Sequence, residues 1–565
     1  MKKKIIATLI CIIIVGVGIL SMFLKNLNKY SNIIPVSQYT PFKVTHDSDI
    51  NEKMEQMTDI IGNAIAFEPQ ITHSINSSEI KLVANSIENA KNNALIINDI
   101  INKAKNGTVI TIPSGTYYLD ATIDISNKKD ITITAEGNGA LFINTAYSPF
   151  NTINYKKTPN VFNISSCQNI RIQNISFDYL NYVSAEGTII SHADGNTYFK
   201  LYNEYINGNK TALSGGEIIT SVFTANENGF TEERWFDTAL KLEKKTEQVF
   251  YIPTKIGQVA EKITCRFTVK GPYISYVINV AQTNGLILEN LNCYSCPGGF
   301  VLAVNDNANL YFKDINVGVK EGSQRLLGSN EDCLHIRDVT GTLTLLDSSF
   351  YGIGDDALNI HSQLVEARCD EQNSAVITTQ GATTKLFSKE GETVEFFDNN
   401  YNSLGVATVE TTKANRIIFD QIPKSENIYY MQNVTRSPDT VVSNCEIGFA
   451  RARGLLIQSK NCVIQKCKFK NTRLSAILAA PDFEYWHEGG FCDNLLINNN
   501  SFENCASLNN GMGVINISTS HDSTEGNILC TLGHKNVSIL NNTFNYCVSQ
   551  KIKTFSVINL KQEEN

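Results

Sequence analysis

The sequence lacks an excess of basic residues and contains no long run of like charge. Its formal net charge is −8, from 48 Lys and Arg against 56 Asp and Glu. Because binding to nucleic-acid phosphates requires a basic surface, this balance argues against nucleic acid as a partner. With 565 residues, 42% of them hydrophobic, the chain is long enough to bury a large core and to form several domains.

Paired cysteine motifs are also scarce, although the chain contains 14 cysteines. Cys293 and Cys296 have the spacing of a redox or zinc pair, but no second pair accompanies them. Cysteines of an exported protein suggest disulfides, yet several of these fall at expected strand positions. Cys445 and Cys467 share one column of a repeat, where a small buried side chain fits well. We therefore expect most of them to be buried thiols.

The N-terminal apolar segment has no clear small-x-small cleavage site after it. Lys2, Lys3 and Lys4 precede the apolar run 5–24, which reaches the roughly 20 residues needed to cross a bilayer. The three lysines favour a cytoplasmic N-terminus. We expect residues 1–30 to be a signal-anchor, with a cleaved signal peptide as the alternative. Either predicts export, as an anchored cell-surface or a secreted protein that meets the membrane only through this segment.

A short unit recurs along the rest of the chain: apolar, any, polar (often Asn or Asp), small or apolar, any, and Phe or apolar. Its copies are 172–177, 288–293, 312–317, 345–350, 442–447, 464–469, 497–502 and 539–544. Most steps between copies are 22–24 or 33–42 residues, and a short period with variable loops is typical of a solenoid. Asn at the turn tolerates left-handed backbone and can hydrogen-bond to its copy in the next coil. We predict an all-β fold, a right-handed parallel β-helix.

Two outsized steps, of 116 and 97 residues, indicate insertions. Residues 186–270 and 364–435 are strand-like, and we predict two small inserted β-domains there. The second begins just after 355–361 and should form one wall of a site. The other predicted parts are a linker at 31–75, the N-terminal β-helix with a capping helix (within 83–105) at 76–185, the central β-helix at 271–363 and the C-terminal β-helix at 436–565.

Two similar segments carry clustered carboxylates. Residues 331–336 are Glu-Asp-Cys-Leu-His-Ile, and 355–360, one coil later, are Asp-Asp-Ala-Leu-Asn-Ile. Because neighbouring parallel strands lie roughly 4.8 Å apart, Asp332, Asp355 and Asp356 should share one patch of surface. Like charges at close range raise a pKa and are costly, so the cluster suggests acid–base hydrolysis. The alternative is a structural calcium site.

The repeat extends this column to later coils. The next steps align Asp356 with Arg453 and Arg453 with Ser475, which predicts a ladder that starts at Asp332. A permanently charged arginine can hold one carboxylate ionised while repulsion keeps another protonated. For Arg453, charge neutralisation and substrate contact both remain open.

Adjacent carboxylates on a regular strand would point to opposite faces, and burying one in the core would be very unfavourable. Gly352 and Gly354 offer a bulge or bend that turns both Asp355 and Asp356 outward. Inverting glycoside hydrolysis needs a protonated acid and an ionised carboxylate roughly 6.5–9.5 Å apart. We expect diagonal positions on neighbouring coils to supply that distance.

The loop 481–490 carries Trp486, one of only two tryptophans, with Glu488 close by. An aromatic face beside carboxylates suits a sugar, although packing is the alternative for a lone Trp. His361, after the Asp355 motif, is either a substrate hydrogen-bond partner or a polar strand end. We predict substrate binding by His361, Arg453, Trp486 and Glu488.

These motifs, at 331–332, 354–361, 453–459, 486–489 and 498–502, resemble family 110 glycoside hydrolases. That family comprises inverting exo-α-galactosidases acting on terminal α-1,3-linked galactose, and the resemblance runs from about residue 85 to 550. It implies a β-helix with two β-rich insertions and three catalytic aspartates, Asp332, Asp355 and Asp356. By analogy with polygalacturonases, Asp355 is the general acid, and Asp332 and Asp356 position the water. Arg453 stands where polygalacturonases would show a Gly-His-Gly element.

We therefore expect an inverting α-galactosidase that acts on a galactosylated glycan and needs no metal and no cofactor. One alternative is a polygalacturonase-like hydrolase or a calcium-dependent polysaccharide lyase, in which Arg453 abstracts a proton. Another is a non-catalytic glycan-binding surface solenoid.

Overall fold

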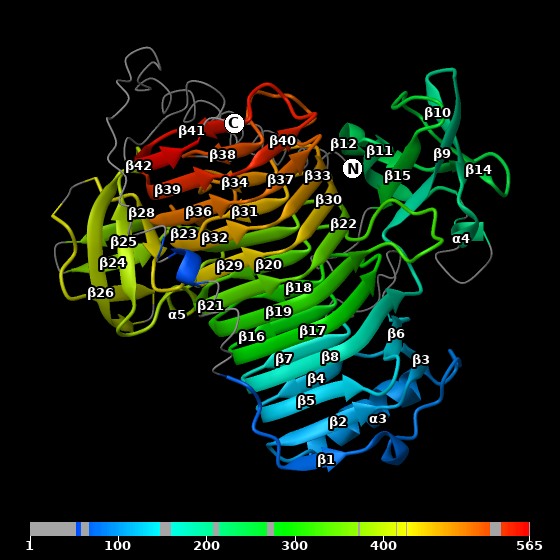
Figure 1. Ribbon diagram of the computed structural model, residues 1–565, viewed down its shortest axis with the longest axis horizontal. Helices are drawn as coiled ribbons and strands as arrows, with labels where there is room; N and C mark the ends of the chain where they lie inside the picture. The colour runs from blue at the N-terminus through cyan, green and yellow to red at the C-terminus, as the bar shows by residue number, and fades with distance from the viewer. Residues whose placement is uncertain are drawn as a thin grey trace, which may run out of the picture.

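The structure is a computed structural model that describes residues 52, 54–57, 67–146, 160–206, 213, 215–267, 276–370, 373–413, 415–424, 427–519 and 533–563. It is mostly β, with long parallel sheets consistent with the predicted β-helix and with further antiparallel sheets (Figure 1). The predicted N-terminal membrane segment lies outside the described residues. Among the helices of the described part, none is long and apolar enough to span a bilayer.

Parallel strands stack in three columns, each coil pairing with the next. The first column is β1 (His73–Ile75), β2 (Thr108–Ile112), β5 (Lys129–Ala135), β8 (Gln168–Tyr179), β17 (Asn284–Tyr294), β19 (Asn307–Gly318), β21 (Val339–Leu346), β29 (Asp439–Ser443), β32 (Asn461–Gln465), β36 (Asn494–Asn498), β39 (His534–Leu540) and β42 (Val557–Gln562). The second column includes the later halves of β8, β17 and β19, together with β3 (Gly115–Leu119), β6 (Ala140–Asn144), β22 (Ser349–Ile353), β30 (Glu446–Ala450), β33 (Lys468–Thr472), β37 (Ser501–Glu503) and β40 (Thr543–Asn545). The third is β4 (Ile123–Ser126), β7 (Phe162–Ser165), β16 (Ile278–Ala281), β18 (Val301–Ala303), β20 (Leu334–Arg337), β23 (Leu358–Asp370), β31 (Leu455–Ile457), β34 (Ile477–Ala479), β38 (Ile515–Ile517) and β41 (Ile552–Thr554).

The core forms because strands such as β4, β7 and β20 alternate buried apolar residues with more exposed polar ones, while β31 and β34 are buried throughout. In register, inward side chains stack on their copies in the next coil. Phe469, Phe502 and Phe544 show this most clearly, with successive ring centroids 5.0 Å apart and planes within 12°. The sequence repeat therefore becomes a row of identical contacts along the solenoid.

Asparagines occupy the bend between the first two columns. Asn174, Asn290 and Asn444 have φ values of 60°, 50° and 55°, the left-handed region that Asn tolerates better than most residues. The Asn290 side-chain amide donates to Oδ1 of Asn174 at 3.1 Å. This confirms the predicted role of the turn asparagines.

The first coils are covered by helix α3 (Ala90–Lys103), which follows the short 3₁₀ helix η3 (Ser77–Glu79). Ala94, Ile97 and Ile101 are buried and belong to the same core as the coils, as their helical spacing predicts. The predicted capping helix within 83–105 is confirmed.

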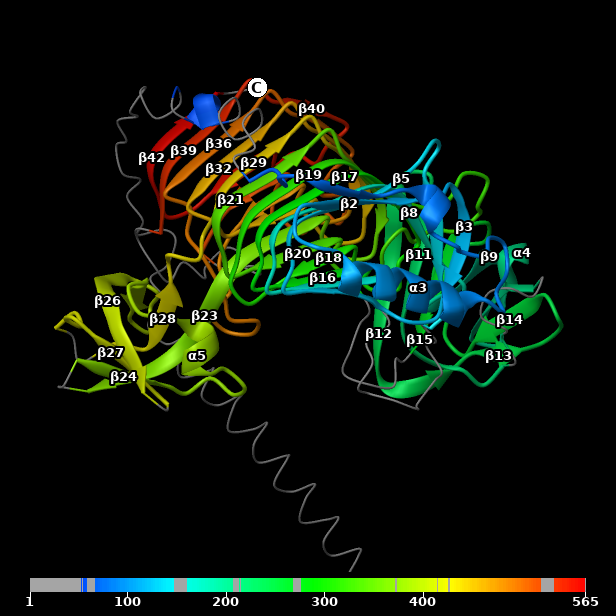
Figure 2. The ribbon, with the colours of Figure 1, turned by 90° about the horizontal axis from the view of Figure 1, so that it is seen from below.

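Two antiparallel sheets stand beside the solenoid. The first consists of β9 (Ser184–Ala193), β10 (Asn196–Leu201), β11 (Ile218–Asn226), β12 (Gly229–Lys241), β13 (Glu243–Lys244), β14 (Val249–Ile252) and β15 (Lys262–Phe267), with helix α4 (Asn203–Ile206). The second continues from β23 into β24 (Ser374–Ile377), β25 (Thr393–Phe397), β26 (Ser403–Lys413), β27 (Arg416–Phe419) and β28 (Tyr430–Asn433), with helix α5 (Thr384–Phe387). Figure 2 shows both on the side of the solenoid that carries β16, β18 and β20. The predicted domain boundaries themselves stay predictions.

Two further features concern the predicted linker and the cysteines. Within the predicted linker 31–75, β1 pairs in parallel with β2, and Met54 is buried against the later coils. The cysteines of the described part carry free thiols, most of them buried. Cys445 and Cys467 occupy the same core position on successive coils. The expectation of buried thiols is confirmed for the described residues.

Candidate active site

The predicted ladder lies on the turns that precede β20, β23 and β31. The register of these strands places Asp332, Asp356 and Arg453 on successive coils. The backbone N–H of Asp356 donates to Oδ1 of Asp332 at 3.2 Å, and that of Arg453 donates to Oδ1 of Asp356 at 2.9 Å. Ser475 follows in the same column, but it is buried and donates to the carbonyl of Gly513 at 2.8 Å. The predicted ladder is confirmed. Arg453 is its last residue with a side chain in the carboxylate cluster, because Ser475 is buried.

Glycines allow both aspartates of the second coil to reach this site. Gly352 has a φ of +70°, and a Cβ on Gly354 would lie 2.5 Å from the carbonyl oxygen of Asn330. The chain therefore bends before Asp355 and Asp356, as predicted, and neither residue lies in a regular strand.

The three carboxylates converge on one point. One oxygen from each of Asp332, Asp355 and Asp356 lies within 4.8 Å of the others. These oxygens meet because all three side chains project from two adjoining turns. The separation of roughly 6.5–9.5 Å between whole acid and base groups stays a prediction. Oxygen ligands so close together also suit a hard cation such as calcium.

Asp332 is held as a carboxylate by three donors. Its Oδ2 accepts from Nδ1 of His335 at 2.9 Å and from the Asn359 amide at 3.1 Å, and its Oδ1 accepts from the backbone of Asp356 at 3.2 Å. Burial alone would raise the pKa of Asp332, but these hydrogen bonds outweigh it and lower the pKa below its ordinary value. Asp332 is thus the ionised member of the cluster.

Asp355 and Asp356 each have an arginine partner. The Arg451 guanidinium lies 2.8 Å from Asp355, and Nε of Arg453 lies 2.9 Å from Asp356. Burial raises the pKa of both carboxyls, while the arginines oppose this rise and the neighbouring carboxylates add to it. The Asp355 side chain is 31% exposed and that of Asp356 only 1%, so Asp355 is the one open to a substrate.

A second group of residues adjoins Asp332. Nε2 of His335 lies 3.2 Å from Nε2 of His361, which lies 3.6 Å from Oε1 of Glu488. Glu488 is on β35 (Glu488–Gly489), which pairs with β23, and Asn359 donates to both of its oxygens. Burial raises the pKa of Glu488 to about 7, with His335 opposing. Two of the predicted binding residues, His361 and Glu488, are thereby brought to the carboxylates.

His335 was not among the predicted site residues. Burial disfavours its charged form, but Asp332 more than compensates and raises the pKa of His335. When the His335 imidazole is charged, both of its ring nitrogens carry a proton. Nδ1 then donates to Asp332 and Nε2 donates to Nε2 of His361. His335, His361 and Glu488 are also metal-binding residue types with ligand atoms within 4.8 Å.

Trp486 lies on the loop that leads into β35, two residues before Glu488. Its side chain is 66% exposed and meets the ring of Tyr485 edge-on at 4.8 Å. The hairpin that carries it is closed by backbone hydrogen bonds between Asp482 and Glu488. The alternative of a packing role does not fit this exposure, whereas an accessible aromatic face does.

The first antiparallel sheet supplies residues that sequence reasoning missed. Arg266 on β15 lies 2.5 Å from Glu331, and Glu233 on β12 lies 2.8 Å from both Arg451 and Arg473. Glu331 belongs to a recognised motif, and Arg451 lies two residues before another. The sheet residues carried no such signal because no repeat relates them to the coils.

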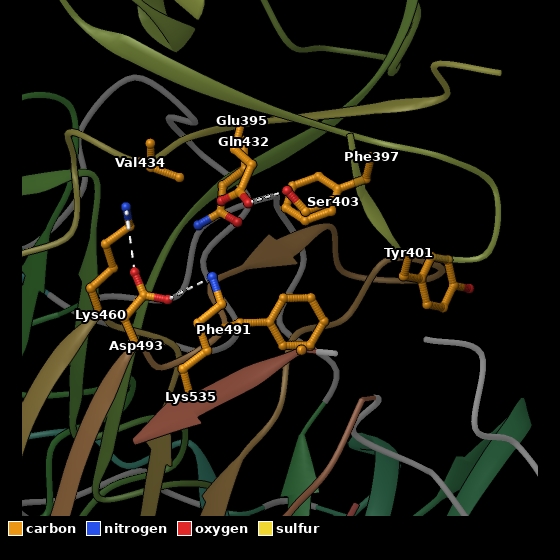
Figure 3. A pocket seen from close by; sticks show the side chains of 11 residues that line it. Glu395, Phe397, Tyr401, Ser403, Gln432, Val434, Lys460, Phe491, Asp493 and Lys535 are labelled. Atoms are coloured by element: carbon orange, nitrogen blue, oxygen red, sulfur yellow. Dashed lines mark hydrogen bonds and ion pairs between the residues drawn. The ribbon is translucent and has the colours of Figure 1, made fainter. Parts of the chain in front are cut away.

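A pocket lies elsewhere, between the second antiparallel sheet and the C-terminal coils (Figure 3). Its lining includes Phe397, Tyr401, Lys460, Phe491 and Asp493. The predicted site residues are absent from this lining. The convergence of carboxylates, and not this pocket, marks the candidate active site.

We expect His335 to make stability depend on pH. Because its folded-state pKa is raised above the unfolded value of about 6.5, its stabilising contribution is complete below that pH and is lost as pH rises through the folded-state pKa. The loss of unfolding free energy in a His335→Gln variant should be larger at pH 5.5 than at pH 8.5, measured by urea denaturation. An equal loss at both pH values would contradict the charged Asp332–His335 pair.

No family model matches the chain. The solved structures it resembles include the catalytic domain of a GH87 alpha-1,3-glucanase (10% identity, TM-score 0.40, covering 87% of this chain and 60% of that one). A family 28 exopolygalacturonase of Yersinia enterocolitica is similar at 9% identity and a TM-score of 0.37, covering 87% of this chain and 78% of that one. These scores are too low to assign a function.

Curated sequences give a stronger result. The chain is 24% identical over 482 residues to alpha-1,3-galactosidase B of Bacteroides thetaiotaomicron, covering 76% of this chain and 73% of that protein. It is 24% identical over 445 residues to alpha-1,3-galactosidase A of Bacteroides fragilis, covering 73% and 70% respectively. The chain is therefore a distant homologue of the alpha-1,3-galactosidases A and B, the family 110 glycoside hydrolases that its motifs resemble.

Proposed function

We propose that the chain is an exported glycoside hydrolase that removes terminal α-linked galactose, of the α-1,3 linkage, from glycans by inversion on a right-handed β-helix. The observation that carries this proposal is the convergence of Asp332, Asp355 and Asp356, each with its own cationic partner, in a homologue of alpha-1,3-galactosidases. Export rests on the lysines and apolar run of the N-terminus.

Asp355 is the general acid of this mechanism. It is the most exposed of the three carboxyls, and burial raises its pKa, so it can hold a proton for the leaving glycosidic oxygen. Once the proton has moved and the bond between C1 and that oxygen has broken, Arg451 at 2.8 Å stabilises the resulting carboxylate.

Asp332 and Asp356 together hold the attacking water. Two oxygens up to 4.8 Å apart can both accept hydrogen bonds from one water molecule, because each such bond spans roughly 2.8 Å. Asp332 is ionised through its three donors. Burial raises the pKa of Asp356 to about 7, with Arg453 opposing the rise, so Asp356 is ionised above neutral pH. One of the pair accepts the proton of the water as its oxygen attacks C1 from the face opposite the leaving group, which yields β-galactose.

Galactose binding falls to the residues next to Asp332. Glu488 and His361 present polar groups on one side of the carboxylates, and Trp486 presents an exposed ring two residues from Glu488. The hydroxyls of a sugar can hydrogen-bond to Glu488 and His361, and its apolar C–H face can stack on Trp486.

The deciding experiment is hydrolysis of an α-1,3-galactosyl disaccharide by residues 31–565 in the presence of EDTA, with the product anomer followed by NMR. We expect β-galactose to be released first. Release of α-galactose would replace inversion by a double displacement. Activity lost with EDTA and restored by calcium would overturn metal independence, and an ultraviolet-absorbing product from uronate polymers would favour a lyase.

An Asp355→Asn variant should hydrolyse the disaccharide at least ~100-fold more slowly, the usual scale for loss of acid–base catalysis. Asp493→Asn is the matched control, since Asp493 is a partly exposed carboxylate that lines the separate pocket. Near-parental turnover by Asp355→Asn, with both proteins folded by circular dichroism, would rule out Asp355 as the acid.

Removal of Arg453 should move the acidic limb of the kcat/KM profile to higher pH. Without this guanidinium the pKa of Asp356 rises further, by roughly 1–3 units for loss of an adjacent arginine. Arg453→Lys, which keeps the charge, should shift the limb less than Arg453→Ala does. Identical profiles for the parent and both variants would make Arg453 a purely structural residue.

A further inference from the structure

The second tryptophan of the chain, Trp235 on β12, stands at the active site from the first antiparallel sheet. Arg451 and Arg266 approach its ring, with guanidinium carbons 5.8 and 5.3 Å from the ring centroid. Arg451 also lies 2.8 Å from Asp355. Trp235 is thus separated from the proposed acid by a single side chain.

The Trp235 ring is both exposed and held in place. It is 53% exposed, which leaves a large aromatic surface uncovered by the fold. Its indole N–H donates to Glu233, and the ring of Phe223 packs against it at 6.0 Å and 64°. Glu233 is itself fixed by Arg451 and Arg473 at 2.8 Å each. An aromatic surface fixed from several sides is preorganised to receive a ligand.

The position of Trp235 relative to the carboxylates indicates which sugar residue of the substrate its ring would contact. Asn359 on β23 joins Asp332 to Glu488 on β35, whereas Asp355 is joined through Arg451 to Glu233 on β12. Because the general acid protonates the glycosidic oxygen, the leaving sugar lies on the side of Asp355. That side is the one on which Trp235 stands.

We propose that Trp235 is the platform for the sugar on the leaving-group side of the cleaved bond, and so a determinant of which glycans are accepted. This inference rests on the proposed function. The exposed indole face stacks on the apolar C–H face of that sugar, and the flanking arginines donate to its hydroxyls. The inserted sheet thereby selects the glycan, while the coils perform the chemistry.

The test compares two substrates that share galactose and differ in the leaving group. An α-1,3-galactosyl disaccharide has a leaving sugar, whereas α-galactosyl fluoride has only fluoride. We expect Trp235→Ala to lower the ratio of kcat/KM for the disaccharide to that for the fluoride about tenfold, mainly through KM. Trp235→Phe should restore most of the ratio, because it keeps an apolar ring.

Trp486→Ala is the matched control, since Trp486 is the other exposed tryptophan and lies on the galactose side. Its loss should lower both rates in proportion and leave the ratio unchanged. An unchanged ratio in Trp235→Ala would overturn the proposal, whether both rates fall together or neither falls. A parent protein that hydrolyses neither substrate would refute the proposed function instead.

Discussion

Parallel, in-register pairing of successive coils is the constraint on which the rest of the structure depends. Each turn lies against the same turn of the next coil, so residues distant in sequence become neighbours at strand spacing. Asp332 and Asp356 are 24 residues apart and are joined by a hydrogen bond, and Arg453 is joined to Asp356 across 97 residues. The same pairing that builds the core therefore gathers the carboxylates.

The close approach of these carboxylates concentrates negative charge, and a separate cationic side chain lies against each carboxylate. Each of the four carboxylates has its own cationic partner: Glu331 with Arg266, Asp332 with His335, Asp355 with Arg451 and Asp356 with Arg453. Because the partners and the extent of burial differ, the pKa of Asp332 falls while those of its neighbours rise. Opposed pKa values on adjoining carboxyls are what acid–base catalysis uses.

Much of this arrangement could be predicted from the sequence because the repeat fixes the register. Aligned copies predicted that Asp332, Asp356 and Arg453 share a column, and the glycines before Asp355 predicted the bend. Distances within the site could not be predicted in this way. One oxygen from each carboxylate lies within 4.8 Å of the others because two bent turns, and not two straight strands, carry them.

The sequence by itself determined the stacked coils and the column that joins Asp332, Asp356 and Arg453, since both follow from a periodic local pattern. Only the tertiary structure decided which side chains surround that column. Glu233 meets Arg451 across 218 residues and Arg266 meets Glu331 across 65, and no period relates those positions. Contacts between an inserted sheet and a coil depend on how two surfaces pack. No single segment of the chain specifies that packing.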